Sequence, residues 1–510
     1  MLVAGLVLSD LKLYSCFVFL RDFSMSLFED LVKVNDLLIS EEEKALKVKS
    51  LITDPSTKGE SFPDNIRLES MQFLDFRLFR NAELNLTFPL TVLVGVNGRG
   101  KTSILEAIVH HLTWLIAKIG KEKGTGSSLV EADISKESLE GSSAQVVAVY
   151  KVGGEIGEGK EKKRGNLLSA TLVAKKLLST SSVSSSFESY TQYGEIIRCL
   201  IKSVGTINLP LLASYGVERT CLMRKRKKGS GSSTYKKLSQ AEAFSSALMG
   251  TKSFQSLAFI DWFIAQSKIS ANASDFRKKE RANKSIRLMR EALKGIIPDF
   301  QNIRLDLGKG GDDILICMNA SEVYFEQLSD GQRLFISLVA DIVWRLIELN
   351  PIRDCPLNGH GIVLIDEAEL HLHPTWQQVI LPGLIQAFRG LQFIVTTHSP
   401  QVVSTVARDA VRLLNDKVGT TTKVIYNKPE FETKGRQSSD ILSEVMQTHP
   451  RPDVKEKRWL SECYRLILSG QEEKRFEVEA LLKKIRNHFG EMSVEYQSLA
   501  NLTRQKVVES

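Results

Sequence analysis

Residues 95–102 read Gly-Val-Asn-Gly-Arg-Gly-Lys-Thr, and this stretch constrains the fold more than any other. It lies between a run of β-formers at 90–94 and a helical pattern that starts at Ser103. The three glycines allow a backbone that turns its N–H groups towards a phosphate at the positive end of the helix. The spacing predicts a P-loop, in which Lys101 contacts the outer phosphates of ATP and Thr102 ligates Mg²⁺. The residues expected to bind the nucleotide here are Asn97, Gly98, Gly100, Lys101, Thr102 and Ser103.

A second motif, Leu-Ser-Asp-Gly-Gln-Arg at residues 328–333, stands directly before an apolar helical run. Ser329 suits the N-cap of that helix, and the exposed N–H groups of a helix N-terminus bind anions. A Ser-Asp-Gly turn alone is more often only a cap, but behind a P-loop it resembles the signature motif of the ABC ATPase superfamily. The resemblance implies that Ser329, Gly331 and Gln332 bind the γ-phosphate held by the other subunit.

Two apolar runs, at 361–367 and 391–400, are predicted to be strands that end in catalytic groups. The first ends in Asp366 and Glu367, which suits a buried parallel strand with its acids at the carboxyl end. We expect Asp366 to hold Mg²⁺ and Glu367 to polarise the attacking water, because phosphoryl transfer to water requires charge neutralisation and a positioned base. The second ends in His398, which resembles the switch histidine that contacts the γ-phosphate in the same superfamily.

Residues 368–374, between these two runs, include His371 and His373. Two histidines at this spacing, without further Cys or His ligands, are weak support for a zinc site. The stretch resembles instead the D-loop that crosses the dimer interface of ABC ATPases. Its form is that of the overcoming-lysogenization-defect (OLD) family and related defence ATPases.

Upstream of the P-loop, residues 66–79 alternate as strands do and resemble the opening of recombination- and SMC-type ATPases. In those proteins a Phe-Arg turn lies beside the nucleotide, so Arg77 is a candidate phosphate or base contact. An exposed arginine at a strand end is the commoner situation for any single residue. Gln145 and Gln192 are both weak candidates for a Q-loop glutamine, and the sequence does not decide between them.

The composition sets wider bounds on the function. The 510 residues carry a net charge of +8, which fits binding to a polyanion and an ordinary basic protein about equally. Six cysteines without paired spacing indicate neither a disulfide framework nor a zinc site, which fits a reducing cytoplasm. Asp10 and Lys12 interrupt the apolar N-terminus, so we expect no membrane span and interpret residues 1–24 as an upstream extension.

The predicted fold class is α/β: an ABC-type P-loop ATPase head, a mixed sheet with flanking helices, plus helical additions. We expect an N-terminal extension and helical element at 1–59, the head at 60–435, and a partner-binding C-terminal helical segment at 436–510. A helical insertion is expected at about 236–300, with Phe254, Leu257, Phe259, Trp262 and Phe263 on its apolar face. The β-forming stretches at 410–414 and 423–427 are expected to complete the sheet of the head. Because the chain between the P-loop and the signature motif holds no run of heptads, a long coiled-coil arm of the SMC kind is excluded.

Two basic clusters are candidates for contacts to a phosphate backbone. Residues 224–228, with Lys236 and Lys237 behind them, form the denser cluster, and residues 277–281 form the second on the predicted helices. Stacked positive charge without aromatic residues can bind DNA or RNA without reading bases. For the first cluster a solvated loop is slightly favoured over that interpretation.

The C-terminal tail separates related families. An OLD-type nuclease would carry a Toprim domain with clustered carboxylates here, but the tail has no Asp-x-Asp pair and too few residues. Residues 438–446, followed by Arg451 and Pro452, resemble the C-terminal helical segment of the PtuA-type ATPases of Septu and retron anti-phage systems. That resemblance implies a cytoplasmic ATPase without a nuclease site of its own, which dimerises head to head and regulates a PtuB-like HNH nuclease. In retron systems a reverse transcriptase and its multicopy single-stranded DNA (msDNA) would be further partners.

Two alternatives stay open. A DNA repair or recombination ATPase of the SMC/RecF type would share every nucleotide motif. A nucleotide-gated scaffold with little turnover is the other, although the presence of Glu367 argues against a dead site. The sequence leaves open the trigger, the nucleic acid bound, the oligomer beyond a dimer of heads, and whether ATP activates or restrains the partner.

Overall fold

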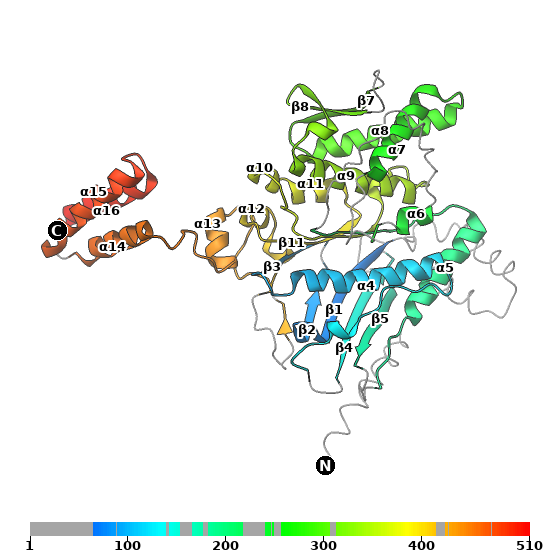
Figure 1. The fold of residues 1–510 in the computed structure, drawn as a ribbon, viewed down its shortest axis with the longest axis horizontal. Helices are drawn as coiled ribbons and strands as arrows, with labels where there is room; N and C mark the ends of the chain where they lie inside the picture. Colours follow the sequence, from blue (N-terminus) through cyan, green and yellow to red (C-terminus); the bar gives the residue numbers. More distant parts are fainter. Residues whose placement is uncertain are drawn as a thin grey trace, which may run out of the picture. The chain divides into compact units, whose positions relative to one another are not determined.

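The fold is described from a computed structural model of the chain. It describes residues 65–87, 89–138, 142–153, 166–176, 182–217, 240–245, 247–248, 257–306, 313–414, 424–426, 428–470 and 472–509. The chain divides into two compact units between Gln437 and Ser438 (Figure 1). The N-terminal element predicted at 1–59 and the basic cluster at 224–228 with Lys236 and Lys237 lie outside the described residues. The domain limits given above stay predictions.

A five-stranded parallel sheet with the strand order β12-β3-β11-β10-β6 carries most of the motifs. Its strands are β3 (Leu90–Val94), β6 (Leu211–Tyr215), β10 (Gly361–Ile365), β11 (Leu391–Thr397) and β12 (Val411–Leu413). Every residue of β3, β10 and β11 is buried, as expected for central parallel strands covered on both faces. Since the carboxyl ends of parallel strands share one edge, the P-loop, Asp366 and His398 all follow that edge.

A second five-stranded sheet is antiparallel except for its edge strand β13 and has the order β13-β2-β1-β4-β5. Its strands are β1 (Ile66–Phe76), β2 (Phe79–Asn85), β4 (Ser143–Val152), β5 (Asn166–Lys175) and β13 (Val424–Ile425). Residues 423–427 were expected to complete the sheet that contains residues 410–414. The expectation is wrong in this respect, because β13 pairs with β2 whereas β12 pairs with β3.

The buried Gln392 on β11 joins the two sheets. Its Oε1 accepts the N–H of Leu68 on β1 at 2.8 Å, and its Nε2 donates to the carbonyl oxygens of Leu68 and Leu86 at 2.8 and 2.6 Å. Gln392 is 1% exposed, so these bonds form away from water. A buried amide with three backbone partners fixes the spacing of the two sheets at this point.

Helix α4 (Lys101–Gly120) follows the P-loop, contacts β11 of one sheet and β4 of the other, and runs between the two sheets in Figure 1. It packs lengthwise on α5 (Glu188–Val204). The remaining helices of this unit are α6 (Gln240–Ser245), α7 (Leu257–Asn272), α8 (Phe276–Ile296), α9 (Asp330–Leu349), α10 (Pro374–Gln377), α11 (Ile380–Ala387) and α12 (Pro400–Val403). Short 3-10 helices are η2 (Glu131–Asp133), η3 (Phe325–Gln327), η4 (Pro356–Asn358) and η5 (Arg408–Ala410).

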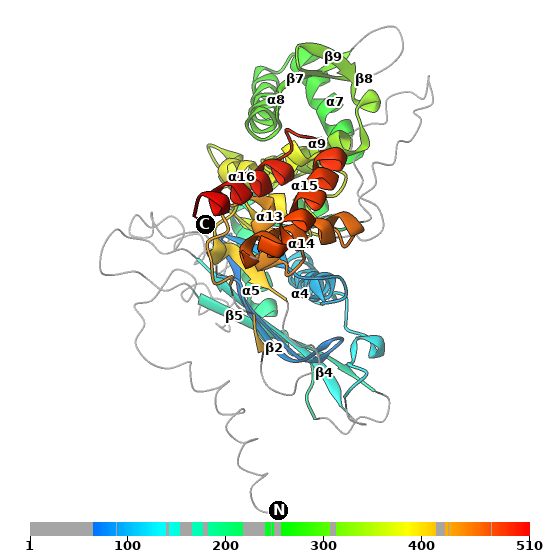
Figure 2. The same ribbon diagram turned by 90° about the vertical axis from the view of Figure 1, so that its left-hand side faces the viewer.

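Helices α7 and α8 of the predicted insertion form one lobe with a small third sheet (Figure 2). In this lobe α7 and α8 pack together, and both contact β7 (Phe300–Asp306). Strand β7 forms an antiparallel sheet with β8 (Asp313–Met318) and β9 (Ser321–Tyr324). Of the predicted apolar face, Phe259, Trp262 and Phe263 are buried on α7. Phe254 and the side chain of Leu257 lie outside the described residues. Sequence periodicity did not reveal the three strands that follow.

The second unit is helical. It comprises α13 (Ser438–Asp440), the π-helix η6 (Ile441–Val445), α14 (Lys455–Ser469), η7 (Glu472–Lys474), α15 (Arg475–Phe489) and α16 (Val494–Glu509). Helices α14, α15 and α16 pack around one apolar core that contains Cys463, Ile467 and Ile485. Across the described part of both units, no helix is long and apolar enough to cross a membrane.

Candidate nucleotide site

The P-loop turns from β3 into α4 through two glycines in the left-handed region. Gly98 has φ of 78° and Gly100 has φ of 88°, values that side-chain-bearing residues rarely adopt. A Cβ atom on Gly100 would also overlap the ring of Phe79. Asn97, Gly98 and Thr102 are exposed, and Ser103 lies half-buried in the first turn of α4. The loop therefore presents an open face, as a phosphate-binding loop requires.

The ammonium group of Lys101 is held inside this loop. Its Nζ donates to the carbonyl oxygens of Gly95 and Val96 at 2.7 and 3.1 Å, and the residue is only 6% exposed. Burial lowers the pKa of Lys101, while the carboxylates of Asp366, Glu367 and Glu369 act in the opposite direction. These acids therefore keep a positive charge favourable beside the loop.

Asp366 and Thr102 bring two oxygen ligands together at the edge of the parallel sheet. The buried carboxylate of Asp366 accepts a hydrogen bond from Thr102 Oγ1 at 3.2 Å and another from Thr396 Oγ1 at 2.5 Å. Mg²⁺ prefers oxygen ligands and is commonly held by one or two protein groups together with phosphates and water. The hydroxyl and carboxylate of this pair fit such an ion.

Glu367 leaves β10 in an unusual backbone conformation. Its φ is 48°, in the left-handed region, which costs free energy for a residue other than glycine. The conformation is fixed by β11, because the N–H of Glu367 donates to Thr396 Oγ1 at 2.8 Å and that of Ala368 donates to the Thr396 carbonyl at 3.1 Å. Thr396 thus positions both acids of the pair, and no local sequence signal pointed to it.

His398 is exposed at the end of β11, and Glu369 determines where its backbone lies. The two carboxylate oxygens of Glu369 accept the N–H of His398 at 2.5 Å and the Thr397 hydroxyl at 2.7 Å. In the sequence Glu369 is recognisable only as part of the D-loop pattern. Its position two residues after Glu367, within a motif of acids and histidines, was the signal that could have identified it.

The start of α9 packs directly on the D-loop. Ser329 caps the helix, with Oγ accepting the N–H of Gln332 at 3.4 Å and Gln332 Oε1 accepting the N–H of Ser329 at 3.1 Å. A Cβ atom on the buried Gly331 would overlap the backbone oxygen of His371, whose own φ is 60°. Only glycine allows this close approach.

Two further residues attach the D-loop to its surroundings. His373 caps α10 by accepting the N–H of Thr375 on Nδ1 at 3.4 Å. Gln377 donates from Nε2 to the Leu372 carbonyl at 2.9 Å and accepts the Ser399 hydroxyl on Oε1 at 2.7 Å. Gln377, which the sequence analysis did not single out, therefore links the D-loop to the turn after His398.

Arg77 lies against the first turn of α4, but acidic groups hold it there. Its Nη1 donates to Ser103 Oγ at 3.3 Å and pairs with Glu106, while Nε donates to Asp133 Oδ1 at 2.8 Å. Burial lowers the pKa of the guanidinium, but the two carboxylates outweigh burial and the pKa is raised. In this arrangement Arg77 braces β1, α4 and η2, and its contact to a nucleotide stays a prediction.

Neither Q-loop candidate is placed at this edge by the topology. Gln145 lies within β4 of the antiparallel sheet, where it is paired with Leu74 and Val173. Gln192 is exposed on α5. The identity of a Q-loop glutamine therefore stays open.

A parallel sheet that brings the P-loop, the Asp366–Glu367 pair and His398 to one edge, with the signature helix packed on a D-loop, defines a P-loop ATPase head of the ABC type. The family model described as "AAA domain" matches residues 70–304, and one described as "AAA domain, putative AbiEii toxin, Type IV TA system" matches residues 261–404. These matches support ATP binding and ATPase activity.

Relatives narrow this class. The chain is 27% identical to "Retron Vc95 probable ATPase" of Vibrio cholerae, with 83% of this chain and 88% of the relative covered. It is 26% identical to "Retron Ec83 probable ATPase" of Escherichia coli, with 89% and 88% covered. "Septu protein PtuA" of Bacillus mycoides is 30% identical, over 37% of this chain and 28% of the relative. The chain fits the PtuA-type ATPases of retron and Septu systems, which confirms the resemblance that the sequence motifs indicated.

The solved structures include a distant likeness. The crystal structure of an Smc head bound to the C-terminal winged-helix domain of ScpA covers 71% of this chain and 98% of its own, at 16% identity and a TM-score of 0.38. At that score the likeness adds no argument, so the fold class rests on the strand order and the motifs.

Proposed function

We propose that this chain is the ATP-binding and hydrolysing subunit of an anti-phage defence complex, and that its nucleotide state regulates a partner HNH nuclease of the PtuB kind. The observation that carries the proposal is the convergence of Lys101, Thr102, Asp366 and His398 on one sheet edge. The two relatives that cover most of the chain and are named for retrons support the defence role. In a retron setting a reverse transcriptase and its msDNA would be further partners.

The residues of the site have distinct roles in this proposal. Lys101 neutralises the outer phosphates, and the glycine backbone of the P-loop donates N–H groups to them. Thr102 and Asp366 hold Mg²⁺, which when bound would neutralise charge on the β- and γ-phosphates. Glu367 orients the attacking water and accepts its proton, and His398 contacts the γ-phosphate.

Each site requires a second copy of the chain. Ser329 and Asp330 are exposed at the start of α9, so the positive end of this helix faces solvent, where it can meet an anion held by another molecule. Two heads would therefore close on two ATP molecules, with Ser329, Gly331 and Gln332 of each completing the site of the other. Hydrolysis opens the pair and changes the state of the nuclease.

Cleavage of nucleic acid is assigned to the partner. The C-terminal unit with α14, α15 and α16 is the segment that we assign to partner binding, because it forms its own core outside the ATPase head.

Co-purification from the native operon tests the proposal. Wild type and Glu367→Gln are compared with Lys101→Ala as the variant that cannot bind the phosphates, and bound protein and nucleic acid are identified by mass spectrometry and sequencing. We expect an HNH protein whose recovery differs between Glu367→Gln and Lys101→Ala. Recovery of an exonuclease or of DNA alone would favour the repair ATPase. ATP-dependent assembly without turnover in the wild type would favour the scaffold.

A further inference from the structure

Helix α8 has one face in the core and one in solvent. Its buried residues, among them Ile286, Met289 and Leu293, belong to the side that packs against α7, α9 and α11. The opposite side is exposed from the first residue of the helix onwards. The first three turns, residues 276–287, are here named the α8 cluster.

The α8 cluster concentrates positive charge. Residues 275–287 contain six basic and two acidic side chains, against a net charge of +8 for all 510 residues. All six basic residues are exposed. They are Arg277, Lys278, Lys279, Arg281, Lys284 and Arg287. A local excess of this size produces a positive potential that a dispersed charge does not.

Most of this charge is not neutralised by neighbours. Lys278 lies 3.8 Å from the carboxylate of Asp275, and Arg287 lies 3.7 Å from that of Glu291. The other four cations have no side-chain hydrogen bond or ion pair with any residue that the structure describes. Arg277, Arg281 and Lys284 stand at i, i+4 and i+7 and so form one row along the helix. The row is about 10 Å long at a rise of about 1.5 Å per residue, so its three cations can contact neighbouring phosphates of one strand.

An exposed aromatic ring lies in the same first turn of α8 as Arg277. Phe276 is the first residue of α8 and is 76% exposed. An apolar ring in water beside unpaired cations is the combination that binds single strands, in which bases stack on aromatic rings while cations contact the phosphates. A duplex would not expose its base faces to Phe276.

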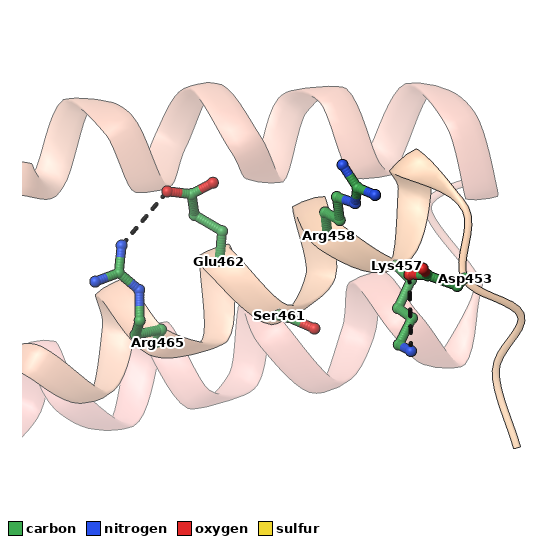
Figure 3. Close-up of a pocket in the computed structure, with 6 residues that line it drawn as sticks. All are labelled: Asp453, Lys457, Arg458, Ser461, Glu462 and Arg465. Atoms are coloured by element: carbon green, nitrogen blue, oxygen red, sulfur yellow. Dashed lines mark hydrogen bonds and ion pairs between the residues drawn. The ribbon is translucent and has the colours of Figure 1, made fainter. Parts of the chain in front are cut away.

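Helix α14 shows the ordinary alternative, a solvated charged face. Its cations alternate with acids and pair with them: Lys457 lies 4.0 Å from Asp453, and Arg465 lies 3.4 Å from Glu462 (Figure 3). The α8 cluster lacks this neutralisation. A face that merely keeps the protein in solution does not need four uncompensated cations, three of them in one row, together with an exposed ring.

We propose that the α8 cluster binds single-stranded nucleic acid, with Arg277, Arg281 and Lys284 on successive phosphates and Phe276 stacked on a base. The proposal deepens the proposed function, on which it rests, by placing the expected nucleic-acid partner on the helical insertion of the head.

The test uses the full chain and a fluorescently labelled oligothymidylate of about 20 nucleotides, a length that exceeds a typical single-strand site. Its affinity is measured by anisotropy between about 50 and 200 mM salt. The combined variant Arg277→Gln, Arg281→Gln and Lys284→Gln removes the row. The matched control Lys457→Gln, Arg458→Gln and Arg465→Gln removes the same charge from α14.

We expect the row variant to lose at least tenfold in affinity at low salt, and its slope of log K against log salt to fall by about 2, because each single-strand phosphate contact contributes about 0.7. The α14 control should change affinity by less than about twofold, since it removes no phosphate contact. Phe276→Ala should weaken binding about tenfold with an unchanged slope, because stacking is not a salt-dependent contact.

Several results would overturn the site. They are an absence of binding by the wild type, an equal loss in the α14 control, an unchanged slope in the row variant, tighter binding of a duplex, or equal binding of polyglutamate. ATP turnover is measured on the same proteins. Unchanged turnover with lost binding supports the site, whereas a wild type that binds the oligonucleotide but never hydrolyses ATP contradicts the proposed function and not the site.

Discussion

At the scale of single residues, the account depends on a few polar groups that hold the catalytic side chains. Glu369 accepts from both the Thr397 hydroxyl and the His398 N–H, so it fixes the backbone from which His398 projects. Thr396 does the same for Asp366 and Glu367. Glu369 lies 28 and 29 positions from Thr397 and His398, and Thr396 lies 30 and 29 positions from Asp366 and Glu367, so only the fold brings these groups together.

Glu369→Gln tests this positioning role. An amide can accept on one oxygen only, so one of the two hydrogen bonds is lost while the shape is kept. We expect the kcat of ATP hydrolysis to fall about tenfold or more, with the Kd of a fluorescent ATP analogue changed by less than about threefold. Glu479→Gln, on exposed α15, is the control. A raised Kd with an unchanged kcat would show that Glu369 does not act through His398.

His111 predicts a pH dependence of stability. The ring is fully buried, with Nε2 3.2 Å from the Val146 carbonyl and Nδ1 3.0 Å from the Tyr190 hydroxyl, and burial lowers its pKa to about 3. In the unfolded chain a histidine binds a proton near pH 6.5. Between these values only the unfolded state is protonated, so stability falls with falling pH.

The expected contribution of His111 is a loss of up to about 1.4 kcal/mol of unfolding free energy per pH unit below about pH 6.5. Urea unfolding at pH 7 and pH 5 measures it. His111→Gln should be less stable at pH 7 and should lose less between the two pH values. The exposed His449→Gln serves as the comparison. An identical pH dependence in wild type and His111→Gln would contradict the assignment.

At the scale of elements, close contacts between motifs matter more than the motifs alone. The start of α9 lies on the D-loop because Gly331 has no Cβ, and Gln392 holds the two sheets together through backbone groups of β1 and the chain after β2. These contacts transmit the geometry of one element to the next.

Gly331→Ala should separate α9 from the D-loop. The added methyl group overlaps the His371 backbone oxygen, and overpacking of this kind costs about 1–3 kcal/mol. Gly295→Ala is a matched control, because Gly295 lies in α8 with nothing within 4 Å of the added atom. The control should be neutral or more stable by about 0.5–1 kcal/mol. Thermal unfolding and ATP-dependent dimerisation measure both effects, and equal behaviour of the two variants would refute the close contact.

Gln392→Leu should destabilise the junction between the sheets. The substitution leaves the backbone N–H and carbonyl of Leu68 without their partner, and buried unsatisfied groups cost about 1–3 kcal/mol each. Denaturant unfolding should show the loss, whereas the exposed Gln192→Leu should change stability by less than about 0.5 kcal/mol. Comparable unfolding free energies for the two variants would mean that the hydrogen bonds of Gln392 do not stabilise the junction.

Some of these elements could be predicted from the sequence, and others could not. The P-loop, the acidic pair and α9 were predicted because glycines, charges and caps at fixed spacing leave few alternatives. Glu369 and Gln392 were not, because their partners lie 28 and 324 positions away, and such pairings depend on strand order. The same limit explains β13, a two-residue strand whose composition does not say which sheet it joins.

At the scale of the whole molecule, the proposed function divides the nucleotide site into two halves that act on different copies of the chain. The P-loop and Asp366 form one half, and the exposed start of α9 forms the other. A site divided in this way makes ATP a link between two subunits, which suits a subunit that controls a partner enzyme. It also means that turnover belongs to the assembly and not to the single chain.

Complementation between two inactive variants measures this directly. Lys101→Ala destroys the P-loop half and Ser329→Arg the signature half, so each protein alone should hydrolyse no ATP. In a mixture, half of randomly formed dimers contain one complete site, and we expect about a quarter of the wild-type turnover per chain. A mixture that forms mixed dimers with ATP yet shows no turnover would contradict the divided site.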